Sequence, residues 1–304
     1  MSQNTSSAVS PRATCRVCNE VAGLKKVLVK HARDAFVSQQ VIDEQWQRLN
    51  FTAPPDLSRA LAESERFLEI LHLAGAELLF LPASKDVTID SIYTRDATIV
   101  SPGGSVLCRM GKPARASEPA AQERALIHVG LPILGRIAPP GLLEGGDVVW
   151  LDARTVAVGQ GSRTNADGIR QLRALLKEAI DNLIVVPLPD RRGPQDVMHL
   201  MSLVSPVDVD LAVVYARLLP AAFTRELLDR GYRLVEVPDE EFETMGTNVL
   251  ATAPRVCVMV QGNPYTRTAL ERAGATVYEY GGQEISLKGG GGPTCLTRPL
   301  ARSA

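Results

Sequence analysis

The chain lacks the features that mark several large classes of protein. Its 304 residues contain no stretch that is long and apolar enough to span a bilayer. The formal net charge of -1 provides no general attraction to nucleic acid or to an anionic membrane surface. The polar first residues also lack the apolar run of a secretory signal. We therefore expect a cytoplasmic protein with residues 1–21 as a flexible tail and residues 22–304 as a single domain.

Cysteine is scarce, and its number is odd. The five cysteines do not suggest a disulfide framework. Cys15 and Cys18 form a C-x-x-C pair, but a structural zinc site needs four ligands and no second pair follows. Cys257 lies in an apolar, strand-like run and is expected to be a small buried side chain. No metal site is predicted, and Cys108 and Cys295 are the remaining cysteines.

A five-fold repeat organises the rest of the chain. Five segments with helical spacing of apolar residues each stop at a residue suited to the left-handed conformation that ends helices. A short apolar run follows each stop directly, and then come a polar or glycine-rich loop and a second apolar run. The stops are roughly 43 to 55 residues apart, a spacing typical of propellers and arrays, and they fall at Gly75, Gly130, Asn182, Gly231 and Gly274.

Each unit is therefore predicted to be a helix, a strand, a loop and a strand. The first strands are expected at 78–81, 131–134, 183–186, 234–237 and 276–280, and the second strands at 97–100, 148–151, 211–214, 256–260 and 296–300. Such repeats bury their apolar faces against their neighbours. The repeat, with neither a Walker loop nor a G-x-G-x-x-G motif, points away from a nucleotide-binding doubly wound sheet.

The five loops between strands carry the residues with the most chemistry. If the units surround an axis, these loops meet at one end, and a thiol, an imidazole and several carboxylates share one pocket. Taken singly, each carboxylate has a plainer interpretation as a turn cap or a surface charge. The loops hold Asp90 and Asp96, Glu144 and Asp147, His199, Asn248, and Cys295.

Cys295 follows four consecutive glycines, residues 289–292, which allow a backbone to approach a ligand closely. The plainer alternative is a flexible end of the chain with an incidental cysteine. A cysteine nucleophile needs an acid–base partner, and His199 is the best placed of the four histidines. A carboxylate can bind a planar guanidinium through two parallel hydrogen bonds. The thiol, the imidazole and the carboxylates together therefore suit a cationic, planar substrate.

The motifs then resemble a known superfamily. They are DSIYTRD at 90–96, EGGD at 144–147, GSRTN at 161–165, His199-Leu200 and GPTC at 292–295. In this order they resemble the guanidino-group-modifying enzymes, which include dimethylarginine dimethylaminohydrolases, arginine deiminases and amidinotransferases. The match runs from about Lys25 to Leu300. It implies a five-bladed, pseudo-symmetric α/β-propeller, the pentein fold, in agreement with the repeat.

The resemblance also implies roles for individual residues. Cys295 would attack the guanidinium carbon, and His199 would protonate the departing amine and then activate water. Asp96 and Glu144 are similar to the acids that hold the guanidinium and orient the histidine. The implied substrate-binding residues are Arg115 and Arg163 at the α-carboxylate, Asp90 at the amino acid end, and Asp147 and Asn248. No metal or organic cofactor is implied.

The member of the superfamily is harder to identify. No extra helical domain separates Asp147 from His199, as in the dimethylarginine hydrolases, whereas TRD at 94–96 and MGTNVL at 245–250 are more similar to arginine deiminases. Met201 stands where deiminases and amidinotransferases usually place a second guanidinium-binding aspartate, and we expect it to contact N-methyl groups.

We therefore expect hydrolysis of an Nω-methylated arginine to citrulline and an alkylamine. The alternatives are an arginine deiminase, an amidinotransferase, and a non-catalytic binding protein of the same fold. The expected partner is a small guanidino substrate, with neither nucleic acid nor membrane, and the sequence leaves a homo-oligomer open. Part of residues 32–55 is expected to cover the site as a lid.

Overall fold

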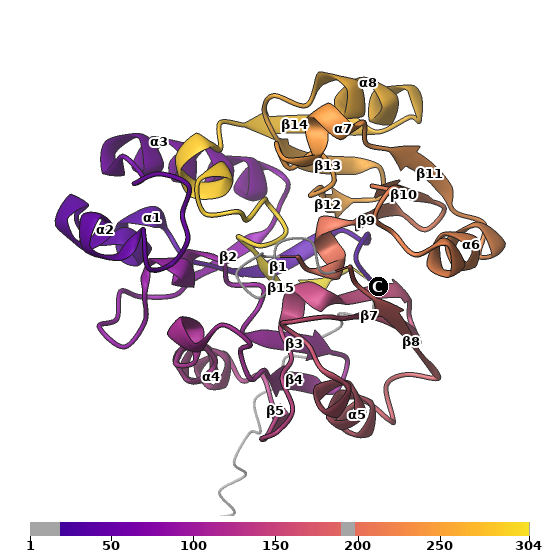
Figure 1. Ribbon diagram of the computed structural model, residues 1–304, viewed down its shortest axis with the longest axis horizontal. Coiled ribbons are helices and arrows are strands. Elements are labelled where there is room, and N and C mark those ends of the chain that lie inside the picture. Colours follow the sequence, from indigo (N-terminus) through magenta and orange to yellow (C-terminus); the bar gives the residue numbers. More distant parts are fainter. Residues whose placement is uncertain (1–18, 190–197, 304) are drawn as a thin grey trace, which may run out of the picture.

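The computed structural model describes residues 19–189 and 198–303, so Cys15, Cys18 and most of the predicted tail lie outside the described residues. Within these ranges, five three-stranded sheets, here called blades 1 to 5, surround a common centre, with the longer helices at the periphery (Figure 1). The predicted five-bladed α/β-propeller is confirmed. No helix in the described part of the chain could cross a membrane.

Four blades follow one plan. Blade 2 contains β3 (Thr98–Ser101), β4 (Gly104–Leu107), α4 (Glu118–His128) and β5 (Ile133–Arg136); blade 3 contains β6 (Val148–Asp152), β7 (Thr155–Gln160), α5 (Ala166–Leu175) and β8 (Asn182–Pro187). Blade 4 contains β9 (Val204–Asp208), β10 (Leu211–Val214), α6 (Ala221–Asp229) and β11 (Arg233–Glu236); blade 5 contains β12 (Leu250–Ala253), β13 (Val256–Val260), α8 (Pro264–Arg272) and β14 (Thr276–Tyr280). The short helix α7 (Asp239–Phe242) lies between blades 4 and 5.

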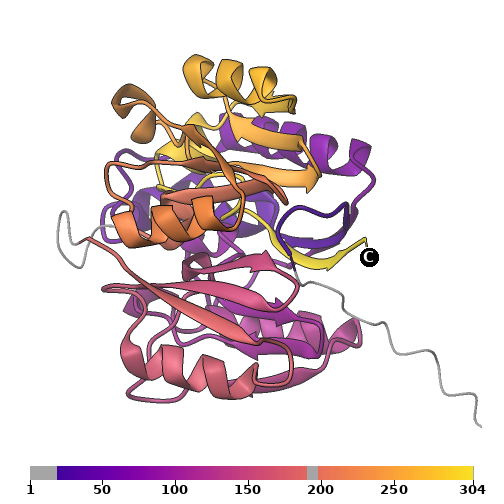
Figure 2. The same ribbon diagram turned by 90° about the vertical axis from the view of Figure 1, so that its right-hand side faces the viewer.

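Blade 1 joins the two ends of the described chain. Its central strand β1 (Leu24–Val29) pairs in parallel with β2 (Glu77–Phe80) and antiparallel with the last strand, β15 (Arg298–Arg302). Between β1 and β2 lie α1 (Ala32–Phe36), α2 (Gln39–Gln45) and α3 (Leu57–Leu73). Figure 2 shows the C-terminal strand beside the N-terminal one, so this pairing closes the ring of blades.

The predicted unit missed one strand in each of blades 2 to 5. In all four, the first two strands form an antiparallel hairpin, and a helix then leads to a third strand that is parallel to the middle one. The prediction found only one hairpin strand in each blade. In blades 2 and 3 it missed β4 and β7, and in blades 4 and 5 it missed β9 and β12. Two-residue turns join these hairpins in blades 2 to 5, so little polar sequence separates their strands.

Four of the five predicted helix stops have the expected backbone. Gly75, Gly130, Gly231 and Gly274 have φ between +74° and +88°. Asn182 was wrong: α5 already ends at Leu175, and Asn182 is the first residue of β8. Its backbone N–H instead donates to the carbonyl oxygen of Arg154 at the β6–β7 turn, which fixes the start of the strand.

The predicted boundary between tail and domain was too late. Glu20 and Val21 are buried, and the Glu20 carboxylate accepts a hydrogen bond of 2.7 Å from the guanidinium of Arg95. The domain therefore includes these two residues, because a carboxylate can be buried at low cost only when a cation accompanies it.

Candidate active site

The five connections between blades bring the predicted residues together. A small cavity, here called the Cys295 pocket, encloses about 20 Å³. The connection from blade 1 to blade 2 provides Asp90 and Asp96, and those from blade 3 to blade 4 and from blade 5 to blade 1 provide His199 and Cys295. The pocket is lined by Asp90, Tyr93, Asp96, Lys112, Arg115, Arg163, His199, Gly289, Gly290, Gly291 and Cys295.

The thiol of Cys295 is held from one side by Asn248. The Asn248 amide nitrogen lies 3.4 Å from Sγ, and its oxygen accepts hydrogen bonds from the backbone and hydroxyl of Thr294. Asn248 thus fixes the loop that carries the thiol and does not itself line the pocket. Burial, followed by the charge of Asp96, raises the pKa of Cys295 above its ordinary value.

The glycines before Cys295 make room for protein side chains. A Cβ at Gly291 would lie 2.5 Å from the ring of Tyr93, and one at Gly292 would lie 2.6 Å from the amide of Asn248. Either contact is closer than real Cβ atoms allow. The run of glycines therefore allows the loop to pack tightly against the pocket.

His199 is surrounded by carboxylates. Its Nε2 lies 2.8 Å from Glu144 Oε2, and its Nδ1 lies 3.7 Å from Asp96 Oδ1. Burial alone would lower the pKa of His199, but Asp96, Asp147 and Glu144 together raise it to about 9. The imidazole therefore carries a proton at neutral pH.

Glu144 is held in place by the backbone of the β4–α4 loop and by Arg163. Its Oε1 accepts hydrogen bonds from the N–H groups of Gly111 and Lys112, and Arg163 Nη1 lies 3.4 Å from the same oxygen. Burial acts to raise the pKa of Glu144, but its hydrogen bond with His199 holds that pKa below its ordinary value. Glu144 is thus a fixed negative charge behind the imidazole.

Asp96 is oriented by Arg115. Arg115 Nη1 lies 2.5 Å from Asp96 Oδ2, and the N–H of Gly146 donates to Oδ1. The Arg115 guanidinium also donates twice to Glu118 and once to the carbonyl oxygen of Tyr93. Most of its donors are thus used inside the protein, which makes Arg115 a support for Asp96 as well as a pocket residue.

Asp147 lies behind His199 and is not among the pocket-lining residues. Its carboxylate accepts hydrogen bonds from the hydroxyl of Thr164 at 2.6 Å and from the N–H of Leu200 at 3.0 Å. Burial raises the pKa of Asp147 to about 6. The second contact fixes the turn that begins at His199.

Arg163 is the arginine with free binding capacity in the pocket. It is buried, and its Nε has no hydrogen-bond partner in the described part of the protein. An anionic group that entered the pocket would find this donor unoccupied, because the 3.4 Å contact with Glu144 involves Nη1 only.

Two pocket residues were missed by the sequence analysis. Lys112 Nζ lies 2.6 Å from Asp90 Oδ2 and donates to the carbonyl oxygen of Leu49. The hydroxyl of Tyr93 is buried without a hydrogen-bond partner among the described residues. Lys112 sits in a Gly-Lys-Pro loop without any recognised motif, and Tyr93 looks like an apolar neighbour of TRD, so neither gave a signal.

Asp96, Glu144 and His199 are also the described residues that could approach a metal ion together, with one ligand atom from each within 4.8 Å of the others. The carboxylates, however, already accept hydrogen bonds from Arg115, Gly111 and Lys112. Guanidinium groups beside a cluster oppose a further cation, so the arrangement is suited to proton transfer.

Met201 does not lie where it was expected. It is absent from the residues that line the Cys295 pocket and instead lines a separate small cavity with Glu20 and Arg95. Its side chain belongs to an apolar cluster to which blades 3, 4 and 5 contribute. The expectation that Met201 contacts N-methyl groups is therefore wrong, because the turn after His199 directs it into the core.

Comparison with known proteins matches this chain to a family. The arginine deiminase family model matches residues 84–230 and 219–302. An arginine deiminase of Mycobacterium marinum is 31% identical over 69% of this chain, although the match spans only 60% of that protein. An N(G),N(G)-dimethylarginine dimethylaminohydrolase of Streptomyces coelicolor is 29% identical over 72% of this chain and 78% of its own.

Comparison of the fold with solved structures agrees with the family match. The structure of DDAH from Pseudomonas aeruginosa in complex with citrulline superimposes with a TM-score of 0.73 at 22% identity, covering 92% of this chain and all of that one. At this identity the likeness shows the pentein fold. The family model, which matches more than half of the chain, shows that the chain belongs to the arginine deiminase family.

Proposed function

We propose that the protein is a cysteine hydrolase that acts on the guanidino group of an Nω-methylated arginine. The observation that supports this most is the single pocket that holds a thiol, a protonated imidazole and an oriented carboxylate, contributed by Cys295, His199 and Asp96. The products would be citrulline and an alkylamine. No step calls for a cofactor.

The thiol needs the substrate in order to ionise. Burial holds the pKa of Cys295 above its ordinary value, so the free enzyme carries a thiol at neutral pH. A guanidinium bound beside Asp96 brings a positive charge next to Sγ, and an opposite charge favours the thiolate. The thiol releases its proton to water, and the thiolate attacks the guanidinium carbon, forming a C–S bond as the C=N π electrons move onto nitrogen.

His199 provides the proton for the leaving amine. It is protonated at neutral pH because Asp96, Asp147 and Glu144 outweigh the effect of burial. When the tetrahedral adduct collapses, the C–N bond breaks, the proton passes from His199 to the amine, and a thiouronium remains on Cys295. The now neutral His199 takes a proton from water, the hydroxide attacks the same carbon, and the C–S bond breaks to release the ureido product and the thiol.

The choice of a methylated substrate depends on the number of carboxylates that face the guanidinium. Among the described residues that line the pocket, Asp96 and Asp90 are the acids, and Asp90 is already paired with Lys112. A guanidinium held by Asp96 alone leaves one terminal nitrogen without an acidic partner, and a substituted nitrogen has fewer N–H groups to satisfy. The rival is arginine itself, which the arginine deiminase model favours.

The substrate cannot enter the pocket in this conformation. A volume of about 20 Å³ is close to that of one water site and far below that of an amino acid. Lys112 bonds to the carbonyl oxygen of Leu49, and the N–H of Thr52 donates to that of Lys288 beside the glycine loop. We propose that residues 46–55, part of the predicted lid, move to admit substrate, and that bound substrate protects this segment from protease.

The test is turnover of arginine, Nω-monomethylarginine and Nω,Nω-dimethylarginine by the full-length protein. Citrulline with methylamine or dimethylamine supports the proposal, citrulline from arginine alone supports the deiminase, and ornithine formed with an added amine acceptor supports amidino transfer. Cys295→Ser should reduce turnover by at least about 10³-fold, since removing a nucleophile has effects of this size. The control Cys257→Ser, a buried thiol in β13 outside the pocket, should retain activity.

A further inference from the structure

A second cavity, on the outside of blades 1 and 2, is left unexplained by the proposed function. It lies between β2 with the loop after it and α4, and it encloses about 400 Å³. We call it the β2–α4 pocket. Its size is within the range of small-molecule sites, whereas the Cys295 pocket in the same structure has a volume of only about 20 Å³.

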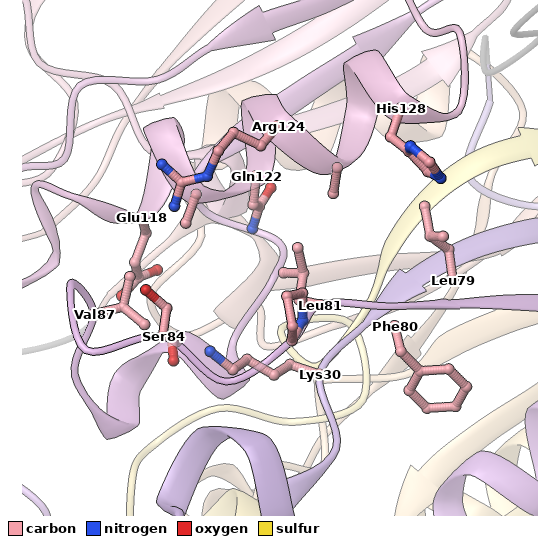
Figure 3. A pocket seen from close by; sticks show the side chains of 14 residues that line it. Lys30, Leu79, Phe80, Leu81, Ser84, Val87, Glu118, Gln122, Arg124 and His128 are labelled. Carbon is pink, nitrogen blue, oxygen red and sulfur yellow. The ribbon is translucent and has the colours of Figure 1, made fainter.

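The Lys30 ammonium marks one end of the β2–α4 pocket, and the other end is apolar apart from His128. Figure 3 shows the stem of Lys30 running along the pocket, with its nitrogen at the end where Ser84, Val87 and Glu118 lie. Leu79 and Phe80 lie at the opposite end. The pocket would therefore orient a ligand that has one polar end and one apolar end.

The polar end contains two groups without partners. Lys30 is only 6% exposed, and its ammonium makes no hydrogen bond or ion pair with any described residue. The hydroxyl of Ser91 lines the same pocket and is also buried without a hydrogen-bond partner in the described structure. An unpaired buried ammonium is costly, so a ligand that provides an anionic oxygen gains from both groups.

The charge near Lys30 fits a monoanion. Glu118 is the acid that lines the pocket, but both of its oxygens accept hydrogen bonds from Arg115 at 2.9 and 2.8 Å. Burial also raises the pKa of Glu118 to about 7, which lessens its negative charge at neutral pH. Arg124 is largely exposed and pairs with Asp86. The charges of Glu118 and, from outside the pocket lining, Asp34 act on Lys30, but no described carboxylate forms an ion pair with it.

We infer that the β2–α4 pocket binds a small monocarboxylate with an apolar tail, its carboxylate at Lys30 and Ser91 and its tail against Leu79, Leu81 and Ala125. The site is separate from the Cys295 pocket but shares its walls. Asp90 and Ser91 are consecutive residues of one 3-10 turn, Ile89–Ile92, and they face the two pockets. Arg115 and Glu118 likewise form a pair with one member in each.

The experiment measures binding of hexanoate to the full-length protein by calorimetry, with acetate, hexylamine and hexanamide as comparison probes. Hexanoate should bind at one site with a Kd below about 1 mM, and each comparison probe at least about tenfold more weakly. Lys30→Met keeps the apolar stem and should weaken hexanoate binding at least about tenfold. The control Lys177→Met, whose side chain is 72% exposed, should change nothing.

Two further variants separate the pocket from other sites. Ala125→Leu fills the tail region without a charge change and should weaken hexanoate but not acetate, whereas Arg163→Ala removes a cation from the Cys295 pocket and should leave hexanoate binding intact. Absence of hexanoate binding, binding that survives Lys30→Met, or binding lost in Arg163→Ala would each overturn the inference. None of these results depends on catalysis, so the proposed function can fail while this site stands, and the reverse.

Discussion

Two clusters of buried charge lie close together in this fold, and their composition differs. The catalytic cluster consists of Asp96, Glu144, His199, Arg115 and Arg163, in which acids and cations alternate within 2.5 to 3.7 Å of one another. The closing cluster consists of Glu20, Arg95, Arg298 and Arg302, and within the described residues it has three guanidinium groups and one carboxylate.

The closing cluster connects blades. Glu20 bonds to Arg95 before β3 and to the N–H of Trp150 in β6. Arg298 donates to the carbonyl oxygen of Arg95, and Arg302 donates to those of Ala22 and Ala251 in β12. The contacts of Arg298 and Arg302 join the last strand to three different parts of the ring. The comparison teaches that one cluster is arranged to hold a proton, whereas the other is arranged to hold carbonyl groups and strand ends.

The hydrogen-bond partners of the arginines in the closing cluster agree with this difference in role. In the closing cluster, the Nε atoms of all three arginines lack hydrogen-bond partners among the described residues. Burial lowers the pKa of Arg298, while Arg95 and Arg302 hold the pKa of Glu20 below its ordinary value against the effect of burial. Excess positive charge makes Glu20 the residue on which that cluster depends.

The largest expected effect is on turnover when the proton is removed from the catalytic cluster. His199→Asn should lower kcat by about 10² to 10⁴-fold, the usual contribution of an acid–base group. The protein should still fold, because Arg115 and Arg163 continue to pair with the two carboxylates. Steady-state kinetics and circular dichroism check both statements. Turnover within about threefold of wild type would remove His199 from the mechanism.

In the closing cluster, a substitution is expected to lower the stability of the fold. Glu20→Gln leaves three buried arginines without a carboxylate and should lower the free energy of unfolding by about 3 to 5 kcal/mol, the usual cost of breaking a buried ion pair. The matched control Glu77→Gln breaks the exposed pair with Lys26 and should cost less than about 1 kcal/mol. Urea unfolding gives both values. Equal effects of the two substitutions would mean that the closing cluster does not depend on Glu20.

The pH dependence sharpens the comparison further. His199 has a pKa raised from 6.5 to about 9, so its pairing stabilises the fold fully below pH 6.5 and is lost as the pH rises through about 9. That loss should be on the order of 1 to 3 kcal/mol in wild type and absent in His199→Asn. Thermal or urea unfolding at pH 6 and pH 9.5 gives the difference. A His199→Asn variant with an unchanged pH profile would contradict the assignment.

The pH dependence of activity should also follow the protonation of His199. The alkaline limb of kcat/KM should lie near pH 9, where His199 of the free enzyme loses the proton that it donates to the amine. Glu144→Gln removes one of the charges that raise this pKa, so the limb should move to lower pH. If the alkaline limb does not move in Glu144→Gln, a group other than His199 causes it.

Much of this architecture could be predicted because each repeat unit contains local sequence signals. Glycines such as Gly75 and Gly231 end helices with positive φ, and the loops that follow the third strand of each blade carry the polar residues. The missed strands β4, β7, β9 and β12 sit in tight hairpins, where the pairing and not the local sequence separates one strand from the next.

Within the site, the sequence pointed to residues but not to their directions. Met201 and His199 are two positions apart, yet one enters the core and the other the pocket. Glu20 was assigned to a tail because the sequence does not reveal that Arg95, 75 positions later, lies against it. Lys112 was missed for a similar reason, since its partner Asp90 belongs to a different blade connection.

Lys112 offers the smallest predicted effect, on binding alone. Its Nζ lies 2.6 Å from Asp90, so a substrate ammonium has to compete with it for that carboxylate. Lys112→Met removes the competitor, and KM should fall by up to about tenfold for substrates with an α-ammonium group, while kcat changes little. For a guanidino acid without an amino group, KM should not fall. The two substrates compared in one variant give the measurement; a KM that rises for both would mean that Lys112 itself binds the substrate, and the catalytic cluster would then include a cation that acts on the ligand directly.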